Sequence, residues 1–269
     1  MTGHELRQAL HAGRRVYGSA LHNPLLWAAQ GYTQLDFVFL DNEHVPLDRS
    51  QTMALCQAYR ARGIAPLVRV PTGDPILACM ALDAGAEGII SPYAEDPEGV
   101  RAMVGAVKYR PLKGEKLARF LRDGGGVEPA TLAYLEERNR NNVLLINVES
   151  LPAIERLDAL LAVPGLDAVL IGPHDLSISM NLPEQYEHPA FIEMAERIIT
   201  RARAAGLGAG IHYWPSLERE KHYVGKGANL IVHSTDTIEA AKAINAALLE
   251  LRRAFGDVPG RQTGESTVV

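Results

Sequence analysis

Strand-like and helix-like segments alternate strictly along this chain. Amphipathic helical segments separate eight short β-rich runs, at residues 15–21, 35–41, 65–71, 88–93, 142–149, 166–173, 206–213 and 228–234. Apolar runs joined by helices are typical of parallel strands buried on both faces. Eight such units in about 250 residues make a TIM barrel. The alternation therefore predicts an α/β fold, a single-domain (β/α)8 barrel over residues 1–258.

A doubly wound open sheet is the alternative fold for alternating strands and helices. That fold commonly carries a glycine-rich phosphate loop after its first strand. Here the first strand runs into "GSALHNP" instead, so the barrel is favoured.

Two segments stand outside the regular alternation. Residues 95–141 are too long for a single helix and contain Gly124, Gly125 and Gly126 in a row. We expect an inserted segment there that covers the mouth of the barrel. The final residues, 259–269, are small and polar, and we expect a flexible tail.

Charge and hydropathy narrow the class of partner. The 269 residues carry a formal net charge of −5, which gives no basic surface for nucleic acid or anionic lipid. No apolar run approaches the roughly 18 residues of a membrane span, and the first residues lack the apolar core of a secretory signal. Small-molecule partners and a cytoplasmic location are expected.

Two carboxylates follow neighbouring strand-like runs. Glu149 ends "VLLINVE" and Asp175 follows "AVLIGPHD". Barrel enzymes place their chemistry at the carboxyl ends of their strands, and two oxygen ligands with open positions suit Mg²⁺, Mn²⁺ or Co²⁺. Asn147 shares the strand face of Glu149 and could orient a ligand or a metal-bound water. The alternative is a solvated glutamate and an aspartate that caps a helix.

Charged groups also end the second and third strand-like runs. Arg69 is the one polar residue in "LVRVP", and it either binds a carboxylate or a developing enolate oxygen, or forms a structural salt bridge across the barrel. Asp41 and His44 stand three residues apart at a strand-to-loop turn, where the acid could orient the imidazole for general acid/base catalysis. Glu43 could serve the rim or a subunit contact.

Five segments in order carry a family resemblance: "FLDNEHVPLD", "LVRVP", "LDAGAEGIISPY", "INVES" and "VLIGPHDLSISM". Over roughly residues 4–256 the chain resembles the metal-dependent class II pyruvate aldolases of the HpcH/HpaI group. The resemblance implies a TIM barrel and aldol or retro-aldol cleavage of a 4-hydroxy-2-oxo acid to pyruvate, or a related 2-oxo acid, and an aldehyde through a metal-stabilised enolate.

The resemblance also implies roles for individual residues. Glu149 and Asp175 match the metal ligands, Arg69 matches a catalytic arginine, and His44, supported by Asp41, matches the acid/base histidine.

Three further positions match the family's site. Gly172 and Pro173 would neighbour the bound carboxylate, and Asp83 matches an acid often contributed across a subunit contact. Family members are usually hexamers, trimers of dimers that exchange their last helix, so a homo-oligomer is implied.

The chain departs from the family pattern at two places. Asn147 stands where relatives commonly carry the longer glutamine. Residues 113–126 replace a segment of the type G-x-R-G. The identity of the aldehyde substrate therefore does not follow from the resemblance.

Two other functions stay open. An acyl-CoA lyase of the citrate lyase beta or malyl-CoA lyase type would share the barrel and the acidic pair, and would need a basic approach that only Lys108 to Arg122 could supply. A non-catalytic barrel that binds a 2-oxo acid is the other.

Overall fold

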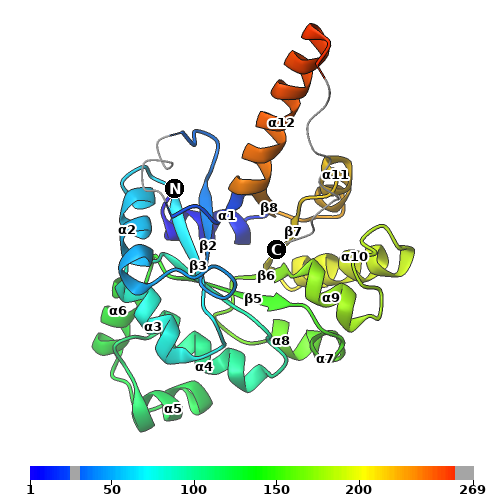
Figure 1. Ribbon diagram of the computed structural model, residues 1–269. Helices are drawn as coiled ribbons and strands as arrows, with labels where there is room; N and C mark the ends of the chain where they lie inside the picture. The colour runs from blue at the N-terminus through cyan, green and yellow to red at the C-terminus, as the bar shows by residue number, and fades with distance from the viewer. Residues whose placement is uncertain (25–30, 258–269) are drawn as a thin grey trace.

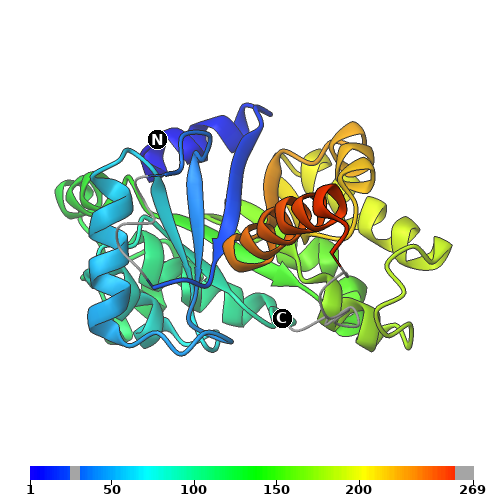
Figure 2. The same cartoon turned by 45° about the horizontal axis from the view of Figure 1, so that its top comes forward.

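Eight parallel strands close into a barrel in this computed structural model, which describes residues 1–24 and 31–257. Each strand pairs with the next along the chain, and the last pairs with the first. Figure 2 shows the amino-terminal strands, blue to cyan, side by side. The strands are β1 (Val16–Leu21), β2 (Phe37–Asp41), β3 (Ala65–Arg69), β4 (Gly88–Ser91), β5 (Val143–Val148), β6 (Ala168–Ile171), β7 (Gly208–Tyr213) and β8 (Leu230–Thr235). The predicted TIM barrel is confirmed.

The described residues form twelve helices, most of which surround the barrel on its outer face (Figure 1). Most begin at a residue whose side chain accepts from the first turn, such as Asp48, Asp74 and Asp96. They are α1 (Gly3–His11), α2 (Arg49–Arg60), α3 (Pro75–Asp83), α4 (Pro97–Lys108), α5 (Gly114–Asp123), α6 (Pro129–Arg138), α7 (Leu151–Glu155), α8 (Leu157–Leu161), α9 (Pro173–Ser179), α10 (Pro189–Ala204), α11 (Leu217–Gly225) and α12 (Asp236–Phe255).

Strand alternation divides the buried side chains into two cores. One lies between the strands and the helices and includes Val38 and Leu40. The other fills the barrel and includes Phe37 and Phe39 of the same strand. Because side chains alternate along a strand, the inward series of β2 continues from Phe39 to Asp41 at the carboxyl end. The inward series of β3, β5 and β7 also end in polar groups. The barrel interior is therefore apolar toward the amino-terminal ends of the strands and polar at its mouth, where their carboxyl ends lie.

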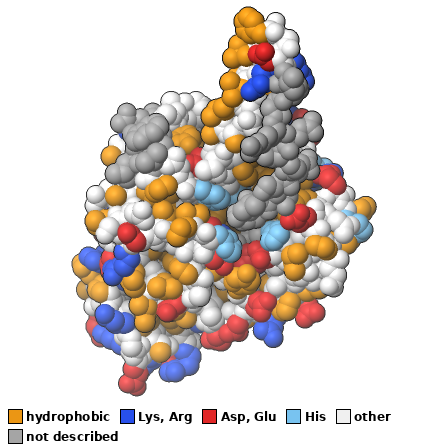
Figure 3. All heavy atoms as spheres, viewed as in Figure 1, with side chains coloured by type: hydrophobic (Ala, Val, Ile, Leu, Met, Phe, Trp, Pro, Cys, Tyr) orange, Lys and Arg blue, Asp and Glu red, His pale blue; other side chains and the backbone are white. Residues whose placement is uncertain are grey.

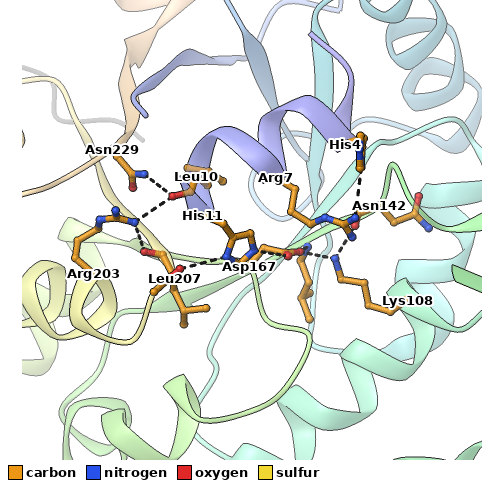
Figure 4. A network of polar contacts seen from close by, with 12 residues as sticks. His4, Arg7, Leu10, His11, Lys108, Asn142, Asp167, Arg203, Leu207 and Asn229 are labelled. Carbon is orange, nitrogen blue, oxygen red and sulfur yellow. Dashed lines mark hydrogen bonds and ion pairs between the residues drawn. The ribbon is translucent and has the colours of Figure 1, made fainter. Parts of the chain in front are cut away.

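A buried polar network closes the opposite end of the barrel (Figure 4). Helix α1 contacts β1, β3, β5 and β7 there. Lys108 of α4 forms an ion pair with Asp167, and its Nζ also donates to the Asn142 carbonyl over 2.6 Å. His11 Nε2 lies 3.1 Å from the other Asp167 oxygen. Burial by itself would raise the pKa of Asp167, but the Lys108 charge and these hydrogen bonds hold it below its ordinary value.

The inserted helices lie away from the mouth, contrary to the expectation from the sequence. Leu117 and Leu121 of α5 pack on Gly105 of α4, and the Asn139 side chain after α6 donates to the Arg110 carbonyl. The insertion follows α4, which has already returned the chain to the amino-terminal end of the barrel, and it joins β5 at that same end. In the described ranges, the mouth is lined without any residue of α5 or α6.

Helix α12 projects from the body of the molecule (Figure 1). As described, none of its residues is buried, and four large apolar side chains on it are exposed: Ile244, Leu248, Leu251 and Phe255. The expected tail, 259–269, lies outside the described residues. In residues 1–24 and 31–257, no helix combines the length and the apolar character that crossing a bilayer requires.

Candidate active site

A cavity of about 220 Å³ opens at the carboxyl ends of the strands. Figure 3 shows histidine and acidic side chains gathered near the centre of this face. Seven residues singled out from the sequence line the cavity: Asp41, His44, Arg69, Asn147, Gly172, Pro173 and Asp175. They come from four different βα units, those of β2, β3, β5 and β6, so the closed barrel is what brings them together.

Arg69 and Asp41 form a buried bidentate ion pair. Arg69 Nε donates to Asp41 Oδ1 over 2.9 Å, and its Nη2 donates to Oδ2 over 2.6 Å. Glu43 Oε2 lies 3.1 Å from the same Nε, and the guanidinium stands over the Phe39 ring at 5.2 Å. Burial opposes the charge of Arg69, but the hydrogen bonds and charge of Asp41 raise its pKa above the ordinary value. The contacts of Arg69 with other described residues use Nε and Nη2, which leaves Nη1 for a ligand.

The expected dyad between Asp41 and the His44 imidazole is wrong. Asp41 Oδ1 also accepts from the backbone N–H groups of Glu43, over 2.9 Å, and His44, over 3.4 Å. Its lone pairs are therefore taken by Arg69 and by the turn itself. The acid nearest the imidazole is Glu43, whose Oε2 lies 3.9 Å from Nε2. His44 lines the cavity with 40% of its side chain exposed.

Glu149 is held by two donors just behind the cavity wall. Its Oε1 accepts from the Tyr93 N–H over 2.8 Å and its Oε2 from Asn147 Nδ2 over 2.8 Å. A Cβ on Gly172 would stand 2.2 Å from Oε2, so only glycine leaves room for this carboxylate. Burial and the Asp175 charge raise the pKa of Glu149 despite both hydrogen bonds.

Tyr93 links the two candidate metal ligands, a role that the sequence did not reveal. Its N–H binds Glu149, and its hydroxyl donates to Asp175 Oδ1 over 3.4 Å. Its φ of 48° lies in the left-handed region, which is uncommon for a residue with a side chain. Its position in the sequence, two residues after β4 at the carboxyl end of the strand, was the available signal.

The acidic groups fit a hard divalent cation. Burial, together with the charges of Asp41 and Asp175, raises the pKa of Glu43 against the charge of Arg69, and Asp175 also raises the pKa of Glu149, so a bound cation would relieve the repulsion between these carboxylates. In the part of the chain that the structure describes, the buried Asn147 Oδ1 has no hydrogen-bond partner. Among the described residues, no group of three or more His, Cys, Asp or Glu side chains could hold a metal. Two carboxylates completed by water and a chelating substrate remain the arrangement that suits Mg²⁺ or Mn²⁺.

Asp83 does not reach this cavity within one chain. It ends α3, its side chain is 70% exposed, and it pairs with Arg110 Nη1 over 2.6 Å. A contribution of Asp83 across a subunit contact stays a prediction.

Comparison with known proteins confirms the resemblance found in the sequence. A model of the family described as HpcH/HpaI aldolase/citrate lyase matches residues 16–243. A 2-keto-3-deoxy-L-rhamnonate aldolase from Klebsiella pneumoniae subsp. pneumoniae is 35% identical over 225 residues, covering 82% of this chain and 81% of the relative. A 5-keto-4-deoxy-D-glucarate aldolase from Shigella dysenteriae is 29% identical over 220 residues, covering 81% and 84%.

A solved structure supports the same assignment. The crystal structure of the HpcH/HpaI aldolase from Desulfitobacterium hafniense superimposes with a TM-score of 0.80 at 28% identity, covering 96% of this chain and 99% of that one.

Proposed function

Because the chain is an enzyme that belongs to the HpcH/HpaI aldolase/citrate lyase family, we propose that it cleaves and forms the C3–C4 bond of a 4-hydroxy-2-oxo acid. The products of cleavage are pyruvate, or a related 2-oxo acid, and an aldehyde. The observation that carries this proposal is the placement of the Glu149 and Asp175 carboxylates, joined by Tyr93, at the mouth where Arg69 keeps a free Nη1.

Glu149 and Asp175 would hold a divalent cation, Mg²⁺, Mn²⁺ or Co²⁺, with Asn147 Oδ1 free to bind one of its waters. When bound, the cation supplies Lewis acidity to the carboxylate and keto oxygens of the 2-oxo acid. The substrate carboxylate would lie against the Gly172–Pro173 turn, which lines the cavity beside Glu149.

Arg69 stabilises the negative charge that develops on the keto oxygen as the C3–C4 bond breaks. Its Nε and Nη2 are fixed by Asp41, so Nη1 is aimed before the substrate arrives. Such preorganised donors cost no reorganisation at the moment of reaction and are worth about 10²–10³ in rate.

His44 removes the proton of the C4 hydroxyl during cleavage and returns it during condensation. It lines the cavity and remains partly exposed, so it can exchange this proton with water. Glu43, and not Asp41, is the acid placed to orient its ring.

The position of α5 argues against the acyl-CoA lyase alternative. The basic residues that could bind a CoA nucleotide, including Lys113, Lys116 and Arg119, fall on or beside a helix that packs against α4 and lines no part of the cavity.

Deuterium exchange into the pyruvate methyl group tests the proposal. NMR measures the loss of the methyl proton signal. We expect exchange with Mg²⁺, Mn²⁺ or Co²⁺ and no exchange with excess EDTA. Glu149→Gln should abolish it, whereas Glu218→Gln, at a glutamate with 81% of its side chain exposed, should leave it unchanged. Exchange that survives EDTA or Glu149→Gln would refute metal-dependent enolate formation at this site.

We also propose a homo-oligomer that covers the apolar stripe of α12, in line with the hexamers of the family. Leu248 and Phe255 are 51% and 78% exposed, and apolar side chains grouped in this way favour an interface. Leu248→Glu should reduce the mass measured by light scattering, and an unchanged mass would place the contact elsewhere.

A further inference from the structure

We propose that His212 acts as a fixed hydrogen-bond acceptor that selects aldehydes bearing a hydroxyl group. This inference rests on the proposed aldolase function and assigns a residue that determines which aldehyde is accepted as the second substrate. Cleavage of the deoxy sugar acids in the names of two relatives releases an aldehyde that carries a hydroxyl group, but those names identify no residue that recognises it.

His212 occupies an inward position at the mouth of the barrel. It follows Gly210 at the period of two along β7, and its side chain lines the cavity. The ring packs edge-on against Phe39, with ring centroids 5.8 Å apart, and against Trp214, at 5.5 Å. Contacts on two sides hold the imidazole in one orientation.

A backbone carbonyl determines which ring nitrogen carries the proton. His212 Nε2 lies 3.0 Å from the Ser234 carbonyl oxygen, which can only accept, so Nε2 is the donor. Ser234 has a φ of 46° and lies where the register between β1 and β8 shifts. The irregularity turns this carbonyl toward the side chain on β7.

The ring is neutral, which leaves a lone pair on Nδ1. Burial lowers the pKa of His212 to about 4, and the charges of Arg69 and His22 act in the same direction, opposed by Asp41. Nδ1 forms no hydrogen bond within residues 1–24 and 31–257. It is also absent from the fully buried polar atoms that lack a partner, so it remains accessible. An acceptor facing a cavity is therefore unused.

Because the imidazole is neutral and Nδ1 can only accept a hydrogen bond, it recognises ligand groups that donate one. A substrate hydroxyl can donate to Nδ1, whereas a carboxylate would place its own lone pairs against the nitrogen. A site built to bind a hydroxyl also rejects the analogue that lacks it, because the buried acceptor then stays unpaired. The geometry points to a hydroxyaldehyde in preference to an unsubstituted aldehyde or an aldehyde acid.

The experiment compares three small aldehydes as partners of pyruvate in condensation: glycolaldehyde, acetaldehyde and glyoxylate. In the wild-type holoenzyme, kcat/KM for glycolaldehyde should exceed that for acetaldehyde by about tenfold or more, the effect of one hydrogen bond. His212→Leu, which removes the acceptor, should bring that ratio close to one. His212→Gln, which keeps a neutral acceptor, should retain part of it.

Several results would overturn the inference. These are a wild-type ratio near one, a preference for glyoxylate, or a ratio that survives His212→Leu. Wild-type pyruvate exchange without the hydroxyl preference would leave the proposed function standing and refute the role of His212 alone. Absence of both exchange and condensation with every metal would overturn the proposed function and this inference with it.

Discussion

Replacing Gly172 by alanine should displace the Glu149 carboxylate without straining the backbone. Gly172 has φ −85° and ψ 99°, which alanine adopts readily. The added Cβ would meet Glu149 Oε2 at 2.2 Å, and ordinary contact begins at 3.4 Å, so the oxygen must move by about 1.2 Å. The alanine methyl group and the Glu149 carboxylate cannot both occupy their present positions.

The cost follows from the contacts that the carboxylate now makes. It accepts two hydrogen bonds of 2.8 Å, and a shift of this size breaks at least the one from Asn147 to the displaced oxygen. A hydrogen bond to a charged group is worth about 1.5–3 kcal/mol. Divalent cations such as Mg²⁺ also demand near-ideal ligand positions. We expect metal affinity to fall about 10- to 100-fold.

Calorimetric titration of Mn²⁺ into the metal-free protein measures this loss. Gly99→Ala is the matched control, because a Cβ there meets nothing within 4 Å and Gly99 lies on the exposed face of α4. The reasoning fails if Gly172→Ala binds Mn²⁺ within twofold of Gly99→Ala while remaining folded by circular dichroism.

Three further predictions concern the mouth and the closed end of the barrel. Arg69→Lys cannot keep the bidentate contact and should slow pyruvate exchange about 10²–10³-fold with little change in Mn²⁺ affinity; a rate within fivefold of wild type would contradict the role of the guanidinium. Lys108→Met leaves the Asp167 charge buried with less compensation and should lower the free energy of unfolding by about 3–5 kcal/mol in urea, whereas Lys242→Met, at an exposed pair, should cost less than about 1 kcal/mol. The hydrogen bond to Asp167 raises the pKa of His11, so its stabilisation is complete below pH 6.5 and is lost as pH rises through the raised value; His11→Gln should therefore destabilise more at pH 6 than at pH 9, and equal losses would exclude this linkage.

The barrel and much of its mouth could be predicted because both depend on local pattern. Alternating apolar runs and capped helices specify strands and helices, and eight units leave few ways to bury them. The period of two along each strand then places Asp41, Arg69 and Asn147 on the inner face at the carboxyl end. These conclusions require no knowledge of which side chains touch.

Contacts between distant segments were decided only by the tertiary structure. Asp41 is three residues from His44, yet it binds Arg69, which the strand register places directly opposite. A carboxylate has few lone pairs, and the donors that reach it with the best geometry take them; sequence spacing does not rank those donors. The protonated nitrogen of His212 was decided in the same way, by a carbonyl on a neighbouring strand.

The inserted helices show the same division between local pattern and tertiary structure. Composition alone indicated an irregular segment between residues 95 and 141, and its helices could be read from the sequence. Which end of the barrel they occupy depends on where α4 ends, because a chain that has crossed the barrel must continue from the far side. The sequence by itself determined the elements and their inward faces, and only the closed barrel decided which of those faces meet.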